Sequence, residues 1–249
     1  HRRTLQPGHI SDPGSRTAAT AAAYGGVAMT ADSYDVHTAT TSRGDLMLRH
    51  RPDGALELRV NGVFVMDTVE TSSEIALATS SLSHVERPDR VLIGGLGLGF
   101  TLQAVLADER VRGVDVVEIE DPLIEWMHDG TVPHGPSLLA DPRAVVIAGD
   151  VARVIEAAEA SYDLILLDTD NGPGNLVHQT NAGLYESPLL QASASALTEG
   201  GVLTIWSSHV APELASAMSG IFTAVTETSY PVVLGTRQEN YWLYAGSKR

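Results

Sequence analysis

The sequence contains no cysteine, and Lys248 is its only lysine. The absence of cysteine excludes disulfides, thiolate metal sites and cysteine nucleophiles. No apolar run approaches the ~20 residues that a membrane span requires, and the N-terminus lacks the continuous apolar segment of a secretory signal. We therefore expect a cytoplasmic protein that does not bind membranes.

Basic residues are scarce relative to acidic ones, and the formal net charge of the 249 residues is −15 at pH 7. Affinity for nucleic acid depends on the neutralisation of phosphates, so nucleic acid is not an expected partner. An acidic surface suits a cationic ligand such as a polyamine. A large net charge also keeps a protein soluble, and the charge alone does not separate these two interpretations.

Common hydrolase and metal motifs are missing as well. The nine histidines have no metal-ligand spacing, and the HExxH, GxSxG and P-loop patterns do not occur. Zinc hydrolysis, serine hydrolysis and ATP turnover therefore have no support. We expect no bound metal.

The chain divides into three predicted parts. Residues 1–31 are rich in Ala, Thr, Gly and Ser and show little periodicity, which is typical of a flexible arm. Residues 32–70 contain short alternating apolar runs, and the Asn61-Gly62 pair between two of them is a strong hairpin signal. These runs predict a small antiparallel β-domain of three or four strands, which leaves residues 71–249 as the third part.

The third part alternates between strand-like and helix-like segments, beginning with helical spacing over 72–82. Alternation predicts a parallel sheet with helices on both faces, which is an α/β fold. Two final strand-like runs, joined without a helix, would place an antiparallel strand at the sheet edge. The strands are expected at 90–94, 113–118, 143–147, 162–168, 201–206, 222–229 and 240–245, and the helices near 98–108, 121–129, 150–159, 183–197 and 211–220.

The most informative segment is VLIGGLGLG at 91–99, where a predicted strand breaks into a glycine-rich turn before a helix. Glu118 ends the next predicted strand. In such a βαβ unit the glycines let the backbone approach a ligand, and the acid accepts hydrogen bonds from both ribose hydroxyls. We therefore predict a nucleotide or S-adenosylmethionine site, in which one glycine serves only close packing. The residues of this segment and the next strand that we assign to the site are Gly95, Gly97, Gly99, Glu118 and Ile119.

Acidic residues also follow the other predicted strands. Asp150, next to Val151, opens a helix after a strand and is expected either to cap that helix or to accept the amine of an adenine. Glu120 and Asp121 are expected to cap the helix that follows them.

The segment YDLILLDTDNGPG ends a buried strand with Asp168 and Asp170, directly before a Gly-Pro-Gly loop. Two carboxylates at the mouth of a nucleoside cleft are placed to bind a cationic amine or to remove its proton. Alternatively, Asp168 orders the loop and Asp170 is merely solvated. Tyr185 is expected to assist by hydrogen bonding, and His178 is the one histidine expected near the cleft. The predicted catalytic residues are thus Asp168, Asp170 and Tyr185.

With these residues the chain resembles the spermidine synthase family, a branch of the class I S-adenosylmethionine-dependent transferases. The resemblance runs from about Tyr34 to the C-terminus and rests on ALELRVNGVFVMD, VLIGGLGLG, VVEIED, AGDVARV, YDLILLDTDNGPG and LYESPLL. It implies a small N-terminal antiparallel β-domain, a seven-stranded Rossmann-like class I methyltransferase core and a homodimer. It also implies that the glycines hold the methionine-derived chain, Glu118 the ribose and Asp150 the adenine, with Asp168 beside the reacting centre.

The chain departs from the family's aminopropyltransferases where those enzymes recognise the polyamine. They usually carry an acid inside the glycine loop and a Tyr-His-Glu triplet after the β-domain, and here these places hold Leu98 and Ser72-Ser73-Glu74. They also carry a glutamine soon after the hairpin turn, where this chain has Asn61-Gly62-Val63-Phe64-Val65. Their Asp-x-x-Asp-Pro loop is shortened to Asp168-Thr169-Asp170-Asn171-Gly172, where either Asp170 or Asn171 takes the second acidic place.

The change at Leu98 bears on the cofactor. An acid in the glycine loop would repel the carboxylate of intact S-adenosylmethionine by ~4 kcal/mol at ~4 Å and an effective dielectric near 20. Leu98 removes that repulsion, while the positions expected to hold adenosine remain.

Three hypotheses follow from this pattern. The first is a methyltransferase that uses S-adenosylmethionine and acts on a small molecule or peptide, such as a cationic amine. The second is a divergent aminopropyltransferase that uses decarboxylated S-adenosylmethionine to make polyamines. The third is a non-catalytic nucleoside-binding module.

Overall fold

The computed structural model describes residues 35–169, 179–234 and 236–248. Within these ranges the chain forms a four-stranded sheet of order β1-β2-β3-β4 and a seven-stranded sheet of order β10-β11-β9-β8-β5-β6-β7. The predicted flexible arm, together with Asp170, Asn171 and His178, lies outside the described residues.

The small sheet is antiparallel throughout. Asn61 and Gly62 join β3 to β4 with φ angles of 51° and 77°, as in a type I′ turn. The hairpin that the sequence predicted here is therefore confirmed. The strands are β1 (Val36–Thr41), β2 (Gly44–His50), β3 (Leu56–Val60) and β4 (Val63–Asp67).

The small sheet shares its apolar core with the rest of the chain. Leu46, Leu48 and Leu58 are almost fully buried, and they belong to the same cluster as Leu77 and Leu82 of helix α1 (Ser72–Ser83). The predicted antiparallel β-structure is confirmed, while the boundary between two separate domains stays a prediction.

The large sheet has a parallel centre. Strand β5 pairs with β6 and β8, β6 with β7, and β8 with β9, all in parallel. The strands are β5 (Arg90–Gly94), β6 (Gly113–Glu118), β7 (Ala144–Ala148), β8 (Tyr162–Leu167), β9 (Leu197–Ser207), β10 (Thr223–Leu234) and β11 (Arg237–Ser247). The seven-stranded α/β core is therefore confirmed.

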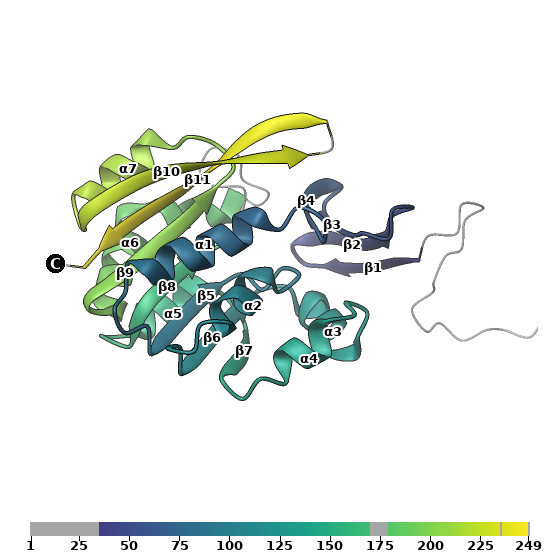
Figure 1. Cartoon of the computed structure of the whole chain (residues 1–249), viewed down its shortest axis with the longest axis horizontal. Coiled ribbons are helices and arrows are strands. Elements are labelled where there is room, and N and C mark those ends of the chain that lie inside the picture. Colours follow the sequence, from purple (N-terminus) through teal and green to yellow (C-terminus); the bar gives the residue numbers. More distant parts are fainter. Residues whose placement is uncertain (1–34, 170–178, 235, 249) are drawn as a thin grey trace, which may run out of the picture.

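The antiparallel strand lies elsewhere than the sequence analysis expected. Strand β11 runs antiparallel to both β9 and β10, and it is second from the edge. The edge strand is β10, because the final hairpin joins the sheet through its second strand. The two-stranded hairpin extends beyond the body of the large sheet (Figure 1).

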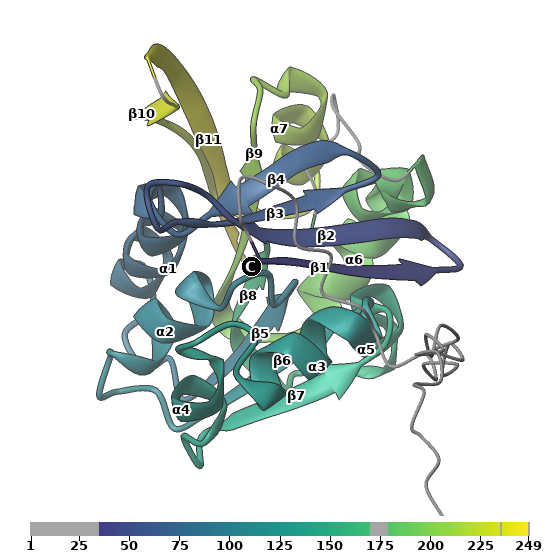
Figure 2. The same cartoon turned by 90° about the vertical axis from the view of Figure 1, so that its right-hand side faces the viewer.

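Helices cover both faces of the large sheet, with α1 and α2 on one side and α5 and α6 on the other (Figure 2). The structure adds one α-helix that was not expected, α4, which is too short to show a helical period in sequence. The expected helix at 183–197 begins only at Ser187, after a 3₁₀ turn. The remaining elements are α2 (Phe100–Leu106), α3 (Asp121–Asp129), α4 (Gly135–Leu139), α5 (Val151–Ala157), η1 (Gln179–Tyr185), α6 (Ser187–Ala196) and α7 (Pro212–Ser219).

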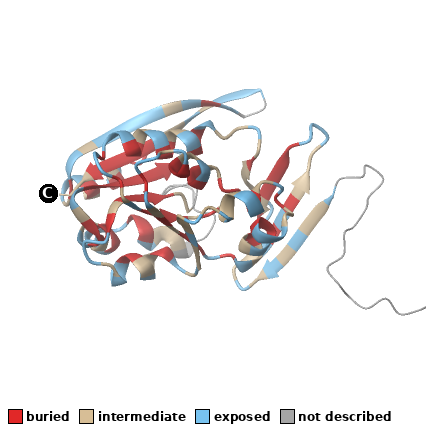
Figure 3. Cartoon of the chain, turned by 60° about the horizontal axis from the view of Figure 1, so that its bottom comes forward, coloured by how far each residue is buried: buried red, intermediate tan, exposed pale blue. Residues whose placement is uncertain are grey.

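Burial explains the continuous apolar runs of the central strands. The residues 91–93 of β5 and 164–167 of β8 are almost completely buried, as the red strands of Figure 3 show. Strands covered on both faces have no reason to alternate between apolar and polar side chains. In the described part of the chain, no helix is both long and apolar enough to cross a membrane.

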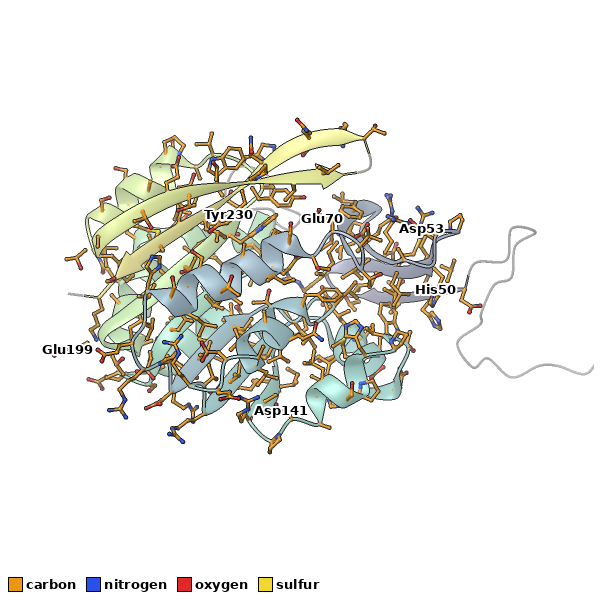
Figure 4. All side chains as sticks on the ribbon, in the orientation of Figure 1. His50, Asp53, Glu70, Asp141, Glu199 and Tyr230 are labelled. Carbon is orange, nitrogen blue, oxygen red and sulfur yellow. The ribbon has the colours of Figure 1, made fainter. Side chains whose placement is uncertain are left out.

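The small sheet lies at one end of the large sheet. Figure 4 shows His50 and Asp53 at the far end of the small sheet and Glu70 where the two sheets meet, while Glu199 lies at the opposite end of the molecule. The carboxyl ends of the parallel strands face the small sheet, because residues that follow β5, β6, β7 and β8 line a cavity together with side chains of β2, β3 and β4.

Candidate active site

A cavity between the two sheets collects most of the predicted site residues. Seven of them line it, from the loops after four neighbouring parallel strands: Gly95, Gly97, Glu118, Ile119, Asp150, Val151 and Asp168. The small sheet covers this cavity with apolar side chains: Leu46, Leu58, Val60, Val65 and Met66. Open α/β sheets bind their ligands at this edge.

The glycine loop fits closely against its surroundings. Gly95 has a φ of 95°, and a Cβ at this residue would overlap the carbonyl oxygen of Asp168. A side chain here is therefore excluded both by the backbone angle and by space. Gly99 has a φ of 86° at the N-cap of α2 and packs against Leu138 and Met127. It is not among the described residues that line the cavity, so its contact with a cofactor stays a prediction.

Glu118 ends β6 and is almost fully buried, with 7% of its surface exposed. Its Oε2 accepts a hydrogen bond from the backbone N–H of Leu96 at 2.9 Å, and its Oε1 accepts one from Glu120 at 2.9 Å. Burial raises the pKa of the Glu118 carboxyl, although the backbone N–H donors oppose that rise. Each carboxylate oxygen has two lone pairs, so both can still accept a ribose hydroxyl.

Asp150 caps a helix, as one of its two interpretations expected. It is the N-cap residue of α5, and its Oδ1 accepts a hydrogen bond from the backbone N–H of Ala152 at 2.9 Å. The cap uses Oδ1 alone, and the residue also lines the cavity. Capping and an adenine contact are therefore compatible, and the second of these stays a prediction.

Asp168 follows β8 and lines the cavity. Burial, with a smaller contribution from the charge of Glu118, raises the pKa of its carboxyl to about 6, against the opposing effect of the Thr101 hydroxyl. That hydroxyl donates to Oδ2 of Asp168 at 3.1 Å. A carboxyl that changes charge close to neutral pH is suited to exchange a proton with a substrate.

Replacing Thr101 by valine is expected to raise the pKa of Asp168 above its present value of about 6. The substitution keeps the size of the side chain but removes the hydrogen bond that stabilises the charged carboxylate. A pH titration of the ¹³C-labelled aspartate carboxyls by NMR measures this pKa. Thr198→Val is the matched control, because it removes a similar 2.8 Å bond to Asp163 outside the cavity. An unchanged or lower pKa of Asp168 in Thr101→Val would show that the bond does not act on the carboxyl.

Glu74 is a site residue that the sequence analysis did not include. It lies on α1, only 8% exposed, and lines the cavity. Burial and the negative charge of Asp168 raise the pKa of its carboxyl to about 7, against a hydrogen bond that it accepts from Ser73 at 2.7 Å. Two signals could have found it: it is the acid of the Ser72-Ser73-Glu74 segment, and it shares the buried face of α1 with Leu77.

The raised pKa of Glu74 predicts how the stability of the protein depends on pH. Between the ordinary value of 4.5 and the raised value of about 7, the folded state binds more protons at this residue than the unfolded state. The free energy of unfolding therefore falls as the pH rises through this window. Glu74→Gln is expected to reduce that fall and to make the protein more stable at pH 8. Urea unfolding of both proteins at pH 5 and pH 8 measures the difference.

The control for this experiment is Glu199→Gln, which makes the same change at an exposed position. It is expected to leave the pH dependence as it is in the original protein. If Glu74→Gln loses as much stability between pH 5 and pH 8 as the original protein does, Glu74 does not have the raised pKa.

Glu120 corrects an interpretation made from the sequence. It occupies the N-cap position of α3, but its side chain makes no capping hydrogen bond. Instead its Oε1 lies 3.3 Å from Nε of Arg43, and its Oε2 accepts a hydrogen bond from Thr41 at 3.0 Å. Arg43 also donates to Oδ1 of Asn181 at 3.3 Å. The small sheet is thereby tied to the core across the cavity.

Acidic side chains outnumber basic ones in the lining of the cavity. Among the described residues that line it, Arg43 is the one cationic side chain, and it is paired with Glu120. Glu74, Glu118 and Asp168 form no ion pair with any described basic residue. A cationic ligand would supply the missing positive charge.

Tyr185 and Leu98 are not among the described residues that line the cavity. Tyr185 is buried in a core with Leu189 and Leu190 and borders a shallow hollow between η1 and α7. It is not among the described residues of the cavity lining, so its catalytic role stays a prediction without support from the geometry. Leu98 is also fully buried, in the core on the α1 and α2 side of the sheet.

The two sheets define a class I methyltransferase-like fold, with an acid-lined cavity at the carboxyl edge of its Rossmann-like sheet. The model of the spermine/spermidine synthase domain matches residues 70–231. The chain therefore belongs to the spermine/spermidine synthase domain family, and the resemblance found in its sequence is confirmed.

Two groups of relatives within this family match the chain. Putrescine N-methyltransferase 3 of Nicotiana tabacum is 32% identical over 154 residues, which cover 61% of this chain and 36% of the relative. Polyamine aminopropyltransferase 2 of Pseudomonas aeruginosa is 29% identical over 136 residues, which cover 53% of this chain and 37% of the relative. The chain thus spans little more than a third of the length of these relatives.

Solved structures share the fold. A spermidine synthase in complex with the transition state analogue AdoDATO matches with a TM-score of 0.74 and 20% identity, covering 86% of this chain and 74% of that one. The spermidine synthase of Thermotoga maritima matches with a TM-score of 0.70 and 20% identity, covering 86% and 72%. These likenesses confirm the architecture of the two sheets.

Proposed function

We propose that the chain is an N-methyltransferase that takes its methyl group from S-adenosylmethionine and transfers it to a small cationic amine. The observation that carries this proposal is the set of three carboxylates, Glu74, Glu118 and Asp168, that line one cavity without a basic partner among the described residues. Both the sulfonium of the donor and the ammonium of the acceptor would compensate this charge.

The order of the strands suggests how the donor would lie. The loops after β7, β6, β5 and β8 follow one another along the sheet, about 4.8 Å apart. Asp150 would contact the adenine, Glu118 the ribose, and Gly95 and Gly97 the methionine chain. Asp168, on the next strand, would then lie beside the reacting centre.

When bound, S-adenosylmethionine supplies an electrophilic methyl group on a sulfonium sulfur. The task left to the chain is to orient the acceptor amine and to free its nitrogen of a proton. Asp168, with its pKa raised to about 6, is ionised at neutral pH and can accept that proton. Glu74 would hold the positive charge of the acceptor.

Relatives of both transfer types match the chain, so a second function has support. An aminopropyltransferase would use decarboxylated S-adenosylmethionine, and the aminopropyltransferase of Pseudomonas aeruginosa is 29% identical to the chain. We favour methyl transfer because the match to the Nicotiana tabacum methyltransferase is longer and more similar, and because the glycine loop carries no acid, Leu98 being buried in the core at that place.

The proposal is tested by incubating the purified chain with putrescine and one of the two donors, and by identifying the products by mass spectrometry. We expect N-methylputrescine with S-adenosylmethionine and little product with the decarboxylated form. An aminopropylated product would establish the second function instead. Saturable donor binding without any product on a wider amine panel would favour the non-catalytic module.

We also propose that the chain works as a cytoplasmic homodimer, as the family resemblance implies. Sedimentation equilibrium tests the assembly directly. We expect twice the mass of the 26.4 kDa chain, and a single-chain mass at micromolar concentration would contradict the dimer.

A further inference from the structure

Trp206 lines the cavity but has no part in the function proposed above. It lies near the end of β9, lines the cavity, and is 9% exposed. Its ring packs edge-on against Tyr241 of β11, with ring centroids 4.7 Å apart and planes at 62°. This contact restrains the indole ring in the cavity wall.

The indole nitrogen of Trp206 is buried and has no hydrogen-bond partner among the described residues. An indole N–H can only donate, and leaving such a donor buried without an acceptor costs free energy. Most buried Trp N–H groups in proteins do have a partner. The hydroxyl of Thr169, which also lines the cavity, is equally buried and unpartnered in the described structure. Two unused polar groups in one cavity indicate a ligand that carries a polar atom.

The position of Trp206 in the sheet indicates which ligand this is. Strand β9 lies on the far side of β8 from β5, β6 and β7. Trp206 is therefore separated from Glu118 and Asp150 by the strand that leads to Asp168. If the donor lies across the loops after β7, β6 and β5, Trp206 faces the acceptor.

The charge of the cavity limits the chemistry of the acceptor atom. Glu74 and Asp168 lie in the same cavity, and its one described cation is already paired with Glu120. A carboxylate on the acceptor would be repelled by these acids. The atom that meets the indole N–H is therefore a neutral acceptor. An aliphatic amine nitrogen is protonated at neutral pH, which leaves an oxygen.

We propose that the acceptor is an amine that also carries a hydroxyl or carbonyl oxygen, and that this oxygen accepts a hydrogen bond from Nε1 of Trp206. This inference rests on the proposed function and specifies its substrate class. A fully protonated diamine offers only donors, so it leaves the indole N–H unpaired. The hydroxyl oxygen of an amino alcohol of equal length can accept a hydrogen bond from the indole N–H.

The first test observes the indole N–H itself and needs no turnover. The chain has three tryptophans, so ¹⁵N-indole labelling gives three Nε1–H signals, and Trp206→Phe identifies the signal of Trp206. With the protein saturated by S-adenosylhomocysteine, we expect 4-aminobutan-1-ol to shift this signal downfield and putrescine to leave it in place. An unmoved signal with the amino alcohol would overturn the proposal. So would an equal downfield shift caused by S-adenosylhomocysteine alone, because the donor's own carboxylate would then be the partner.

The second test compares kcat/KM for the same two amines. We expect Trp206→Phe to lower the ratio of 4-aminobutan-1-ol to putrescine by about tenfold or more, as the loss of one buried hydrogen bond implies. Trp242→Phe, on β11 and not among the described residues of the cavity lining, is the matched control. An unchanged ratio in Trp206→Phe overturns the proposal. If the original protein methylates neither these two amines nor any amine of the wider panel, the proposed function fails and the NMR result alone decides the inference.

Discussion

Glu118→Gln is expected to weaken the binding of S-adenosylmethionine by roughly 100-fold or more. The carboxylate would accept two hydrogen bonds from the ribose, and hydrogen bonds to a charged group contribute about 1.5–3 kcal/mol each. Glu118 also accepts hydrogen bonds from the backbone N–H groups of Leu96 and Glu120. In a glutamine, the side-chain NH₂ group would face one of these N–H groups, and two donors cannot form a hydrogen bond with each other. Isothermal titration calorimetry measures the change in affinity.

Glu125→Gln is the control for this result, since it makes the same substitution on the exposed side of α3. It is expected to bind like the original protein. The role of Glu118 at the ribose would be contradicted by a Glu118→Gln protein that is folded by circular dichroism and binds within about threefold of the original.

Asp168→Asn is expected to lower kcat by roughly 10²–10⁴, the usual contribution of a positioned acid or base, and to change donor affinity by only a few-fold. In the original protein kcat/KM should fall as the pH drops through about 6, because Asp168 then takes up a proton and can no longer accept one from the amine. In Asp168→Asn this fall of kcat/KM at low pH should disappear. Steady-state kinetics from pH 5 to pH 9 measure both effects.

Asp121→Asn, an exposed change in the first turn of α3, is the control for the kinetic result. Asp170→Asn is measured in parallel, because Asp170 lies outside the described residues and its catalytic role stays a prediction. If Asp168→Asn keeps full turnover and its acid limb near pH 6, another group frees the amine of its proton.

The elements of the fold were largely predictable because each depends on local signals. The alternating segments from 72 onward predicted the parallel sheet. Asn61-Gly62 predicted the hairpin turn of the small sheet, where both residues adopt positive φ angles. The place of β11 was not predictable in this way. Which strand of the final hairpin joins β9 depends on packing against the whole sheet, and neither strand carries a local signal for it.

The donor half of the cavity was predictable because its residues follow parallel strands, and parallel strands end at one edge. The acceptor half was not. Glu74 reaches the cavity from α1, and only the packing of that helix against the sheet places its acid near Asp168. Trp206 belongs to an apolar run that is typical of a buried strand, and only the strand order places it beyond Asp168. Tyr185 is not among the described residues that line the cavity, so its role stays a prediction from its position in the sequence.

The most direct test of the central claim is a calorimetric titration of the purified chain with S-adenosylmethionine and, separately, with its decarboxylated form. The account predicts tighter binding of the intact donor, because the glycine loop carries no acid that would repel the donor's carboxylate. Tighter binding of the decarboxylated form would contradict methyl transfer and support aminopropyl transfer. Binding of neither would contradict both enzymatic functions.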